Sequence, residues 1–183
     1  LADLLAYARA ELTPDVIVDV ATLTGAATLA LSREIGAVLS PRPRLLTALR
    51  RAGEQVGEPL WPLPLVESYR QSLRSDIADQ CHIPTVEGVG GGAITAALFL
   101  QAFVPDVPWA HLDIAGTAWK GGAAKGSTGR PVGLLVHYVL EQSRSQVRTA
   151  KAPKSTSRSA TSKAATGTAR KPAAKRPAGS KSA

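Results

Sequence analysis

The chain has 183 residues, with 22 Lys and Arg against 14 Asp and Glu, and a formal net charge of +8. The charge is uneven: residues 1–143 hold 11 basic and 14 acidic side chains (11 − 14 = −3), whereas residues 144–183 hold the other 11 basic side chains (22 − 11 = 11) and no acid. This distribution excludes a uniformly basic nucleic-acid-binding protein and indicates a mildly acidic body with a basic tail.

Helices and short apolar strands alternate through residues 1–142. In chain order, the apolar spacing predicts a helix over 1–11, a strand over 16–20, an Ala-rich apolar segment ending at Leu31, a strand over 35–39 and a helix over 42–57. An irregular or extended segment over 58–64 follows, then a helix over 69–78, a loop over 79–92, a helix over 93–103, a strand over 109–115, a long loop over 116–129 and a helix over 132–141. This alternation favours an α/β fold, a three-layer sandwich around a mixed, largely parallel central sheet.

Residues 143–183 differ in composition from the body. Lys, Arg, Ala, Ser, Thr and Pro dominate there, and Val147 is the last large aliphatic residue. Such a segment cannot bury enough apolar area to offset the entropy cost of ordering it. We therefore expect a body over 1–142 and a disordered basic tail over 143–183.

The cysteine content and the apolar runs bear on the compartment. The single cysteine, Cys81, cannot form an intrachain disulfide, which is typical of a reducing compartment. The longest apolar stretch, residues 93–104, contains Gln101 and falls short of the roughly 20 residues that a membrane-spanning helix needs. We expect no membrane association.

A glycine-rich turn is the first candidate for chemistry. Residues 88–93 (GVGGGA) fit G-x-G-x-x-A before a helix, and Asp113 follows 20 residues after Ala93. That spacing is close to a dinucleotide-binding fingerprint, in which glycines let the backbone approach a pyrophosphate. Residues 81–87 are not a buried apolar strand, however, so we favour a loop that lets the following helix pack closely.

Two other kinds of site find little support. His111 and Asp113 share one face of a strand, as two members of a Ser/His/Asp hydrolase site could, but no G-x-S-x-G nucleophile turn is present. A buried histidine and a strand-end hydrogen-bond acceptor are the favoured interpretations of these two residues. Asp76 and Asp79 could share a helix face, yet the body contains no H-E-x-x-H or clustered carboxylates that would indicate a metal site.

The basic tail could bind a polyanion. Its 11 cations within residues 144–183 would attract nucleic acid with a steep salt dependence, and without aromatic residues the binding would be non-specific. A solubilising extension is an equally good interpretation.

Four segments, taken together, resemble the leucyl aminopeptidase (cytosol aminopeptidase) family. They are DVATLTGA (19–26), GGAITA (91–96), WAHLDIAGTAW (109–119) and TGRP (128–131), in the family's order and spacing. The resemblance runs from Leu1 to about Glu141, and residues 84–89 (PTVEGV) depart slightly from the family's usual shorter loop.

The resemblance implies a two-metal exopeptidase that removes N-terminal residues, Leu among them, from peptides. It implies two divalent ions (Mn²⁺ or Zn²⁺, or else Mg²⁺), a bound bicarbonate, a homohexamer and a cytoplasmic location. The family's metal-ligand motif N-T-D-A-E-G-R is absent, and residues 1–8 resemble the helix that directly follows it. We therefore expect the metal ligands, the second catalytic Lys and the bicarbonate-binding Arg to lie upstream, the sheet to be truncated, and these residues alone to be inactive.

Six positions of this chain match residues on one wall of the family's substrate site. These carried-over residues are Thr22, Leu23, Gly25, Ile83, Ala115 and Ala118. The first three match the strand-end turn beside the substrate's first residue and the bicarbonate. The two alanines match positions that line the specificity pocket, where small residues would admit a Leu-sized side chain, and the isoleucine matches a position near the second substrate residue. The alternative hypothesis is a polyanion-binding module that acts through the tail on a non-catalytic scaffold.

Overall fold

The computed structural model describes residues 1–84 and 90–151, and the side chains of residues 1–84 and 90–145. Two parts of the chain lie outside the described residues: residues 152–183 of the expected tail and residues 85–89 of the expected loop. The description that follows concerns the unit formed by residues 1–150.

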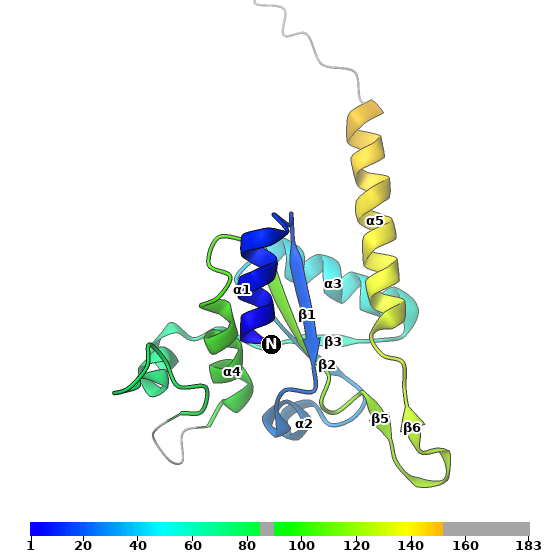
Figure 1. The fold of residues 1–183 in the computed structure, drawn as a ribbon. Coiled ribbons are helices and arrows are strands. Elements are labelled where there is room, and N and C mark those ends of the chain that lie inside the picture. Colours follow the sequence, from blue (N-terminus) through cyan, green and yellow to red (C-terminus); the bar gives the residue numbers. More distant parts are fainter. Residues whose placement is uncertain (85–89, 152–183) are drawn as a thin grey trace, which may run out of the picture. The chain divides into compact units, whose positions relative to one another are not determined.

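A mixed, mostly parallel sheet forms the middle layer (Figure 1). Its strand order is β1 (Ile17–Ala21), β4 (Trp109–Asp113), β2 (Gly36–Leu39) and β3 (Leu60–Pro62). Strands β1 and β4 are parallel, as are β2 and β3, whereas β2 runs antiparallel to β4. The predicted α/β class is confirmed.

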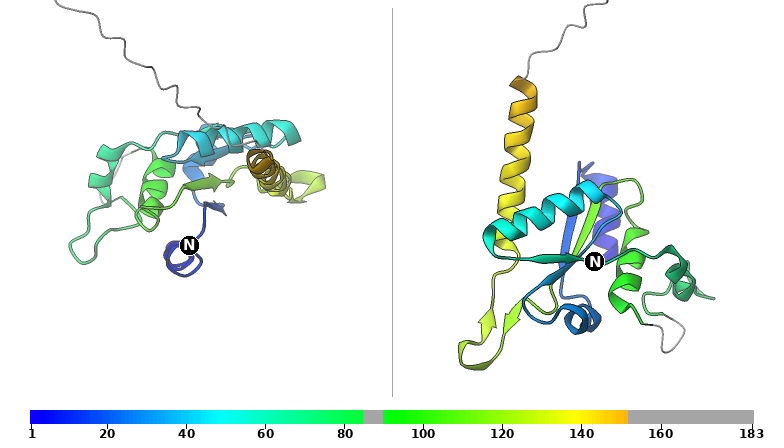
Figure 2. Two further views of the ribbon diagram at one scale, coloured as in Figure 1. Left: turned by 90° about the horizontal axis from the view of Figure 1, so that it is seen from above. Right: turned by 180° about the vertical axis from the view of Figure 1, so that it is seen from behind.

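Helices cover both faces of this sheet, so the three-layer prediction is also confirmed. On one face, α3 (Pro43–Val56) and α5 (Val132–Lys151) pack in a core cluster with Ala110 and Leu112 of β4. On the other face, α1 (Ala2–Glu11), α2 (Gly25–Leu31) and α4 (Gly92–Gln101) contribute to a second cluster around Trp109. Figure 2 shows α1 and α3 on opposite sides of the strands. Successive residues of β4 point to opposite faces, which is why one strand serves both clusters.

The helix expected over 69–78 is instead a 3₁₀ helix, η1 (Glu67–Leu73), followed by turns. Serine hydroxyls here bond to the local backbone and compete with the α-helical pattern. The Ser72 hydroxyl donates to the Tyr69 carbonyl at 2.7 Å, and the Ser75 hydroxyl accepts from the amides of Ile77 and Ala78. Asp76 and Asp79 therefore share no helix face, and both are exposed to solvent, which is the interpretation that the sequence favours for them.

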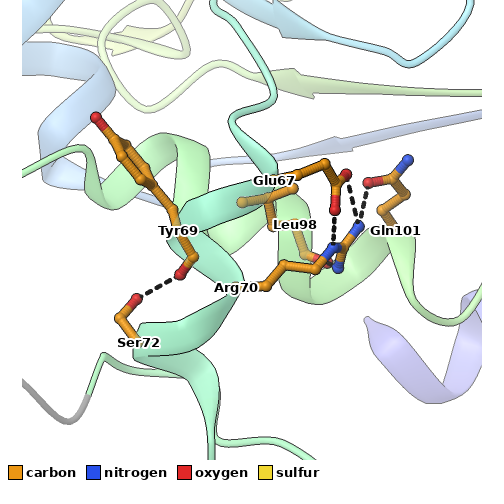
Figure 3. Close-up of polar contacts among 6 residues, drawn as sticks. All are labelled: Glu67, Tyr69, Arg70, Ser72, Leu98 and Gln101. Atoms are coloured by element: carbon orange, nitrogen blue, oxygen red, sulfur yellow. Dashed lines mark hydrogen bonds and ion pairs between the residues drawn. The ribbon is translucent and has the colours of Figure 1, made fainter.

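A single arginine attaches η1 to α4 (Figure 3). Arg70 donates from Nη1 to the Leu98 carbonyl at 2.7 Å and from Nη2 to the Gln101 side chain at 2.6 Å. Its Nε atom donates to Glu67 at 2.7 Å. These bonds hold the start of the segment that leads to Ile83.

Three further boundaries differ from the sequence expectation. The loop over 116–129 contains a short hairpin, β5 (Trp119–Lys120) and β6 (Gly126–Ser127), with the 3₁₀ turn η2 (Gly122–Ala124) between its strands. The extended segment 58–64 supplies β3 to the sheet. The last helix continues past Glu141 and past the composition change at Ser143 to Lys151. Gln, Arg and Ala have high helix propensity, so the helix can continue without large apolar residues.

No helix in the described ranges is both long enough and apolar enough to cross a lipid bilayer.

Candidate functional site

The carboxyl ends of β1 and β4 meet side by side, with Ala21 paired to Asp113. Two turns leave the sheet there: residues 22–24 lead into α2, and residues 114–118 lead into the β5–β6 hairpin. In open α/β sheets, ligands bind beyond the carboxyl ends of the strands. This end of the sheet is therefore where a binding site is expected.

Asp113 joins the two turns. Its carboxylate is 1% exposed, and Oδ1 accepts hydrogen bonds from the backbone amides of Leu23 and Ala115, both at 3.1 Å. Its Oδ2 accepts from the Thr24 hydroxyl at 2.7 Å. The favoured sequence interpretation of Asp113, a strand-end acceptor, is confirmed, and its partners are the turns that hold four of the six carried-over residues.

Thr24 links the Asp113 carboxylate to the first turn of α2. It is the N-cap of that helix, and the hydroxyl that donates to Asp113 also accepts from the Ala27 amide at 3.1 Å. A threonine in this position satisfies an amide that the first helical turn leaves unpaired. The direction of α2 is thereby fixed relative to the end of β4.

The turn after β4 is held against the end of α2 by a glycine. A Cβ atom added at Gly116 would lie 2.0 Å from the Ser32 carbonyl oxygen, so no larger residue fits without movement. The Ala118 amide donates to the Ile114 carbonyl at 2.9 Å, and the Ala118 carbonyl accepts from the Thr128 amide at 3.0 Å. These backbone bonds add to the Asp113 contact with the Ala115 amide in fixing the turn.

The six carried-over residues occupy different environments. Thr22, Leu23 and Gly25 are exposed, and a Cβ atom at Gly25 would meet nothing within 4 Å. Ala115 and Ala118 are half-buried, and Ala118 packs against the α3–α5 core cluster. Ile83 is 66% exposed in the segment after η1.

A cavity of about 610 Å³ brings Leu23 and Ile83 together. Its wall also includes Leu1, the Thr24 side of the α2 cap and the apolar face of α4 at Phe99. Residues from the N-terminal helix, the α2 cap and the segments 82–84 and 92–100 therefore surround one space. Thr22, Gly25, Ala115 and Ala118 are not among the described residues that line it.

Behind this end of the sheet lies a buried polar cluster that the sequence analysis did not single out. Asp19 accepts from Trp109 Nε1 at 2.6 Å through Oδ2, and His111 Nδ1 lies 2.5 Å from Oδ1 of Asp19. The Trp109 and His111 rings stack at an interplanar angle of 14°. The signal in the sequence is an acid inside the apolar run VIVDV (16–20).

This cluster does not form a hydrolytic triad. His111 pairs with Asp19, whereas Asp113 pairs with the turns, so the two residues that could have belonged to one triad serve separate networks. His111 is fully buried, as its favoured interpretation predicts, and its Nε2 atom has no hydrogen-bond partner among the described residues.

Two glycines of the glycine-rich turn, Gly91 and Gly92, serve helix packing, whereas a Cβ atom at Gly90 would meet nothing within 4 Å. Gly91 is the N-cap of α4 at φ +79, and a Cβ atom at Gly92 would lie 3.3 Å from the Ala26 Cβ atom of α2. These contacts agree with the close-packing interpretation. Residues 88 and 89 of the turn lie outside the described residues.

The described residues do not fit a metal pair. Within residues 1–84 and 90–151, no group of three or more His, Cys, Asp and Glu side chains could hold a metal ion. Asp76 and Asp79 are exposed in turns after η1.

Comparisons with known proteins identify the family of this chain. The model of the cytosol aminopeptidase family, catalytic domain, matches residues 1–136. A probable cytosol aminopeptidase of Variovorax paradoxus (strain S110) is 51% identical over 158 residues, covering 86% of this chain and 30% of that protein. A cytosol aminopeptidase of Vibrio cholerae serotype O1 (strain ATCC 39315 / El Tor Inaba N16961) is 52% identical over 143 residues, covering 78% of this chain and 28% of that protein.

A solved structure, a mutant of tomato leucine aminopeptidase, matches with a TM-score of 0.70 at 40% identity, over 76% of this chain and 27% of that chain. Fold and sequence together define an α/β domain of the peptidase class. The chain belongs to the cytosol aminopeptidase family. It spans about three-tenths of the length of the curated relatives that it matches.

Proposed function

We propose that this chain forms the substrate-flanking part of a metallo-aminopeptidase that removes N-terminal residues from peptides. In this proposal the turn at Thr22, Leu23 and Gly25 lies beside the first residue of the peptide. The small side chains of Ala115 and Ala118 leave room for a Leu-sized side chain, and Ile83 lies near the second residue.

The observation that carries the proposal is the shared cavity of about 610 Å³ lined by Leu1, Leu23 and Ile83. Two of these residues are carried over from the family's substrate site. The third is the N-cap of α1, the helix that in the family directly follows the metal-ligand motif. A segment that entered α1 through Leu1 would therefore arrive at the cavity where the substrate-flanking residues lie.

The remaining implications of the family belong to the same proposal. We propose that the intact protein uses two divalent ions, Mn²⁺, Zn²⁺ or Mg²⁺, together with a bicarbonate, and assembles as a homohexamer in the cytoplasm. Residues 1–84 and 90–151 supply no metal-ligand set, so in this proposal the ligands come from outside those described residues. The role of this chain is then to bind and orient the peptide, with 1–142 as part of the catalytic domain and 143–183 as a basic tail.

The experiment measures leucine release from Leu-p-nitroanilide by the intact protein, loaded with Mn²⁺ or Zn²⁺ and then stripped with a chelator. We expect metal-dependent release that the chelator abolishes and that added metal restores. A loaded, folded intact protein that releases no leucine, alanine or other N-terminal residue would contradict the proposal.

The tail supports a second, separate proposal. Residues 144–183 carry 11 basic side chains and no acid, so we propose salt-dependent, non-specific binding to nucleic acid or another polyanion. Retention on DNA–cellulose at low salt, lost between 50 and about 200 mM NaCl, is the expected result. Equal retention of a protein that lacks the tail would contradict it.

A further inference from the structure

Two turns that come from distant parts of the sequence are joined by one buried side chain. Asp113 accepts from the amides of Leu23 and Ala115 through a single oxygen, and these two amides lie 90 residues before it and two residues after it. Its other oxygen holds the Thr24 hydroxyl. A carboxylate is well suited to this role because it only accepts hydrogen bonds and offers about four lone-pair sites.

Nothing else that we find in the described residues ties the two turns to each other by a side chain. The backbone contact at this place is the Ile114 amide, which donates to the Ala21 carbonyl at 2.9 Å and continues the β1–β4 pairing by one step. Beyond that step the chains diverge, one toward α2 and the other toward the hairpin. The distance between the turns is therefore set by the Asp113 carboxylate.

We infer that Asp113 is a positioning residue that sets the spacing between the turn at residues 22–25 and the turn at residues 115–118, and thereby which first residues of a peptide are accepted. The inference rests on the proposed function, because these turns are the two walls assigned to the peptide's first residue. Asp113 itself is buried and touches no substrate; it acts through the backbone of Leu23 and Ala115.

Asparagine provides a conservative replacement. Its side-chain oxygen can accept from both amides, and its nitrogen can donate to the Thr24 hydroxyl, which still accepts from the Ala27 amide. Asp113→Asn should therefore keep the spacing, whereas Asp113→Ala removes all three side-chain bonds that fix it. Thr24→Val removes the bond to Oδ2 together with the N-cap bond to the Ala27 amide, and it leaves the two amide bonds to Oδ1 in place.

The experiment measures, in the intact protein, the ratio of kcat/KM for Leu-p-nitroanilide to kcat/KM for Ala-p-nitroanilide. This ratio is independent of the fraction of folded enzyme, so a purely structural loss does not move it. A displacement of one turn relative to the other does change the ratio. We expect Asp113→Ala to change the ratio by about tenfold, mainly through the KM of the substrate with the larger first residue. Asp113→Asn should restore the wild-type ratio, and Thr24→Val should give an intermediate change.

Leu49→Ala is the matched control. Leu49 is fully buried in the cluster on the α3 face, against which Ala118 also packs. Its truncation lowers stability but leaves every hydrogen bond of Asp113 in place. The ratio should stay at the wild-type value in this variant. Amide hydrogen exchange provides a readout without activity: Asp113→Ala should deprotect the Leu23 and Ala115 amides together, and Leu49→Ala should not deprotect them selectively.

The outcomes separate the two claims. Suppose that the wild-type intact protein is active and that a folded Asp113→Ala variant has the same kcat/KM ratio. This result overturns the positioning role of Asp113 and leaves the proposed function standing. A wild-type intact protein with no aminopeptidase activity overturns the proposed function, and the positioning role falls with it. A changed ratio in Leu49→Ala would also overturn the inference, because the ratio would then follow stability.

Discussion

His111 Nδ1 and Asp19 Oδ1 lie 2.5 Å apart inside the body, on two neighbouring parallel strands paired in register. Asp19 also accepts from Trp109 Nε1, so a single buried carboxylate satisfies two ring nitrogens. This buried network satisfies both nitrogens that face Asp19 and leaves only His111 Nε2 without a hydrogen-bond partner among the described residues. It ties β1 to β4 directly behind the strand ends that carry the candidate site.

The first prediction concerns this network. Asp19→Ala leaves two buried donors without an acceptor, which should lower the free energy of unfolding by about 3 kcal/mol. Urea denaturation of the purified protein measures this loss. Asp15→Ala, which removes an exposed carboxylate four residues earlier, is the control and should have almost no effect. Equal stability of the two variants would show that the Asp19 contacts contribute nothing.

The second prediction concerns the close contact at Gly116. Gly116→Ala places a Cβ atom 2.0 Å from the Ser32 carbonyl oxygen, and the resulting displacement should lower stability by about 1–3 kcal/mol. Gly121→Ala is the matched control, because a Cβ atom there meets nothing within 4 Å. Thermal unfolding of both variants checks the prediction, and a Gly116→Ala protein as stable as the control would refute the placement of this turn.

The third prediction concerns the size of the first residue. Ala118→Phe in the intact enzyme should lower kcat/KM for Leu-p-nitroanilide more than for Ala-p-nitroanilide, by about tenfold in the ratio, because the larger ring occupies space assigned to the substrate side chain. Ala124→Phe, at an exposed position in η2, should leave the ratio unchanged. If the Ala118→Phe variant kept the wild-type preference for Leu, Ala118 would not line the pocket for the first residue.

The fourth prediction concerns the 183 residues by themselves. Since the described residues contain no metal-ligand set, purified residues 1–183 should release no leucine from Leu-p-nitroanilide in the presence of Mn²⁺ or Zn²⁺. Absorbance of free p-nitroaniline measures the release. Turnover that stays with the chain through repeated purification would mean that these residues hold a complete catalytic site.

The fifth prediction separates the tail from the body. Removing residues 152–183 should abolish retention on DNA–cellulose at low salt and leave the peptidase activity of the intact protein unchanged, because the tail's cations act through long-range charge. Peptidase activity that disappears together with the tail would contradict the independence of the two parts.

The sequence predicted the layers well because local apolar spacing decides them. The strands at Ile17 and Trp109 and the helices at Pro43 and Gly92 all begin within a residue or two of their expected positions. Local hydrogen bonding and helix continuation were harder to foresee. The segment after Tyr69 forms η1 and turns in place of the expected helix, because serine hydroxyls bond to the local backbone. Helix α5 continues beyond the last apolar residues of the body.

The site was predictable in kind but not in its contacts. The sequence indicates that Asp113 ends a strand, yet its partners Leu23 and Thr24 lie about 90 residues away, and only the parallel pairing of β1 with β4 brings them together. The cavity shared by Leu23 and Ile83 likewise depends on how η1 is attached to α4. The six carried-over residues come from the family resemblance, and their roles remain predictions.

The central claim is that the turns at residues 22–25 and 115–118 flank the first residue of a bound peptide. The most direct test is photo-cross-linking: a peptide with a photoreactive leucine at its N-terminus is bound to the intact protein, irradiated, and the labelled residues are mapped by mass spectrometry. The account predicts labelling within residues 22–25 or 114–118, suppressed by excess unlabelled peptide. Labelling confined to the α3–α5 face of the sheet would contradict it.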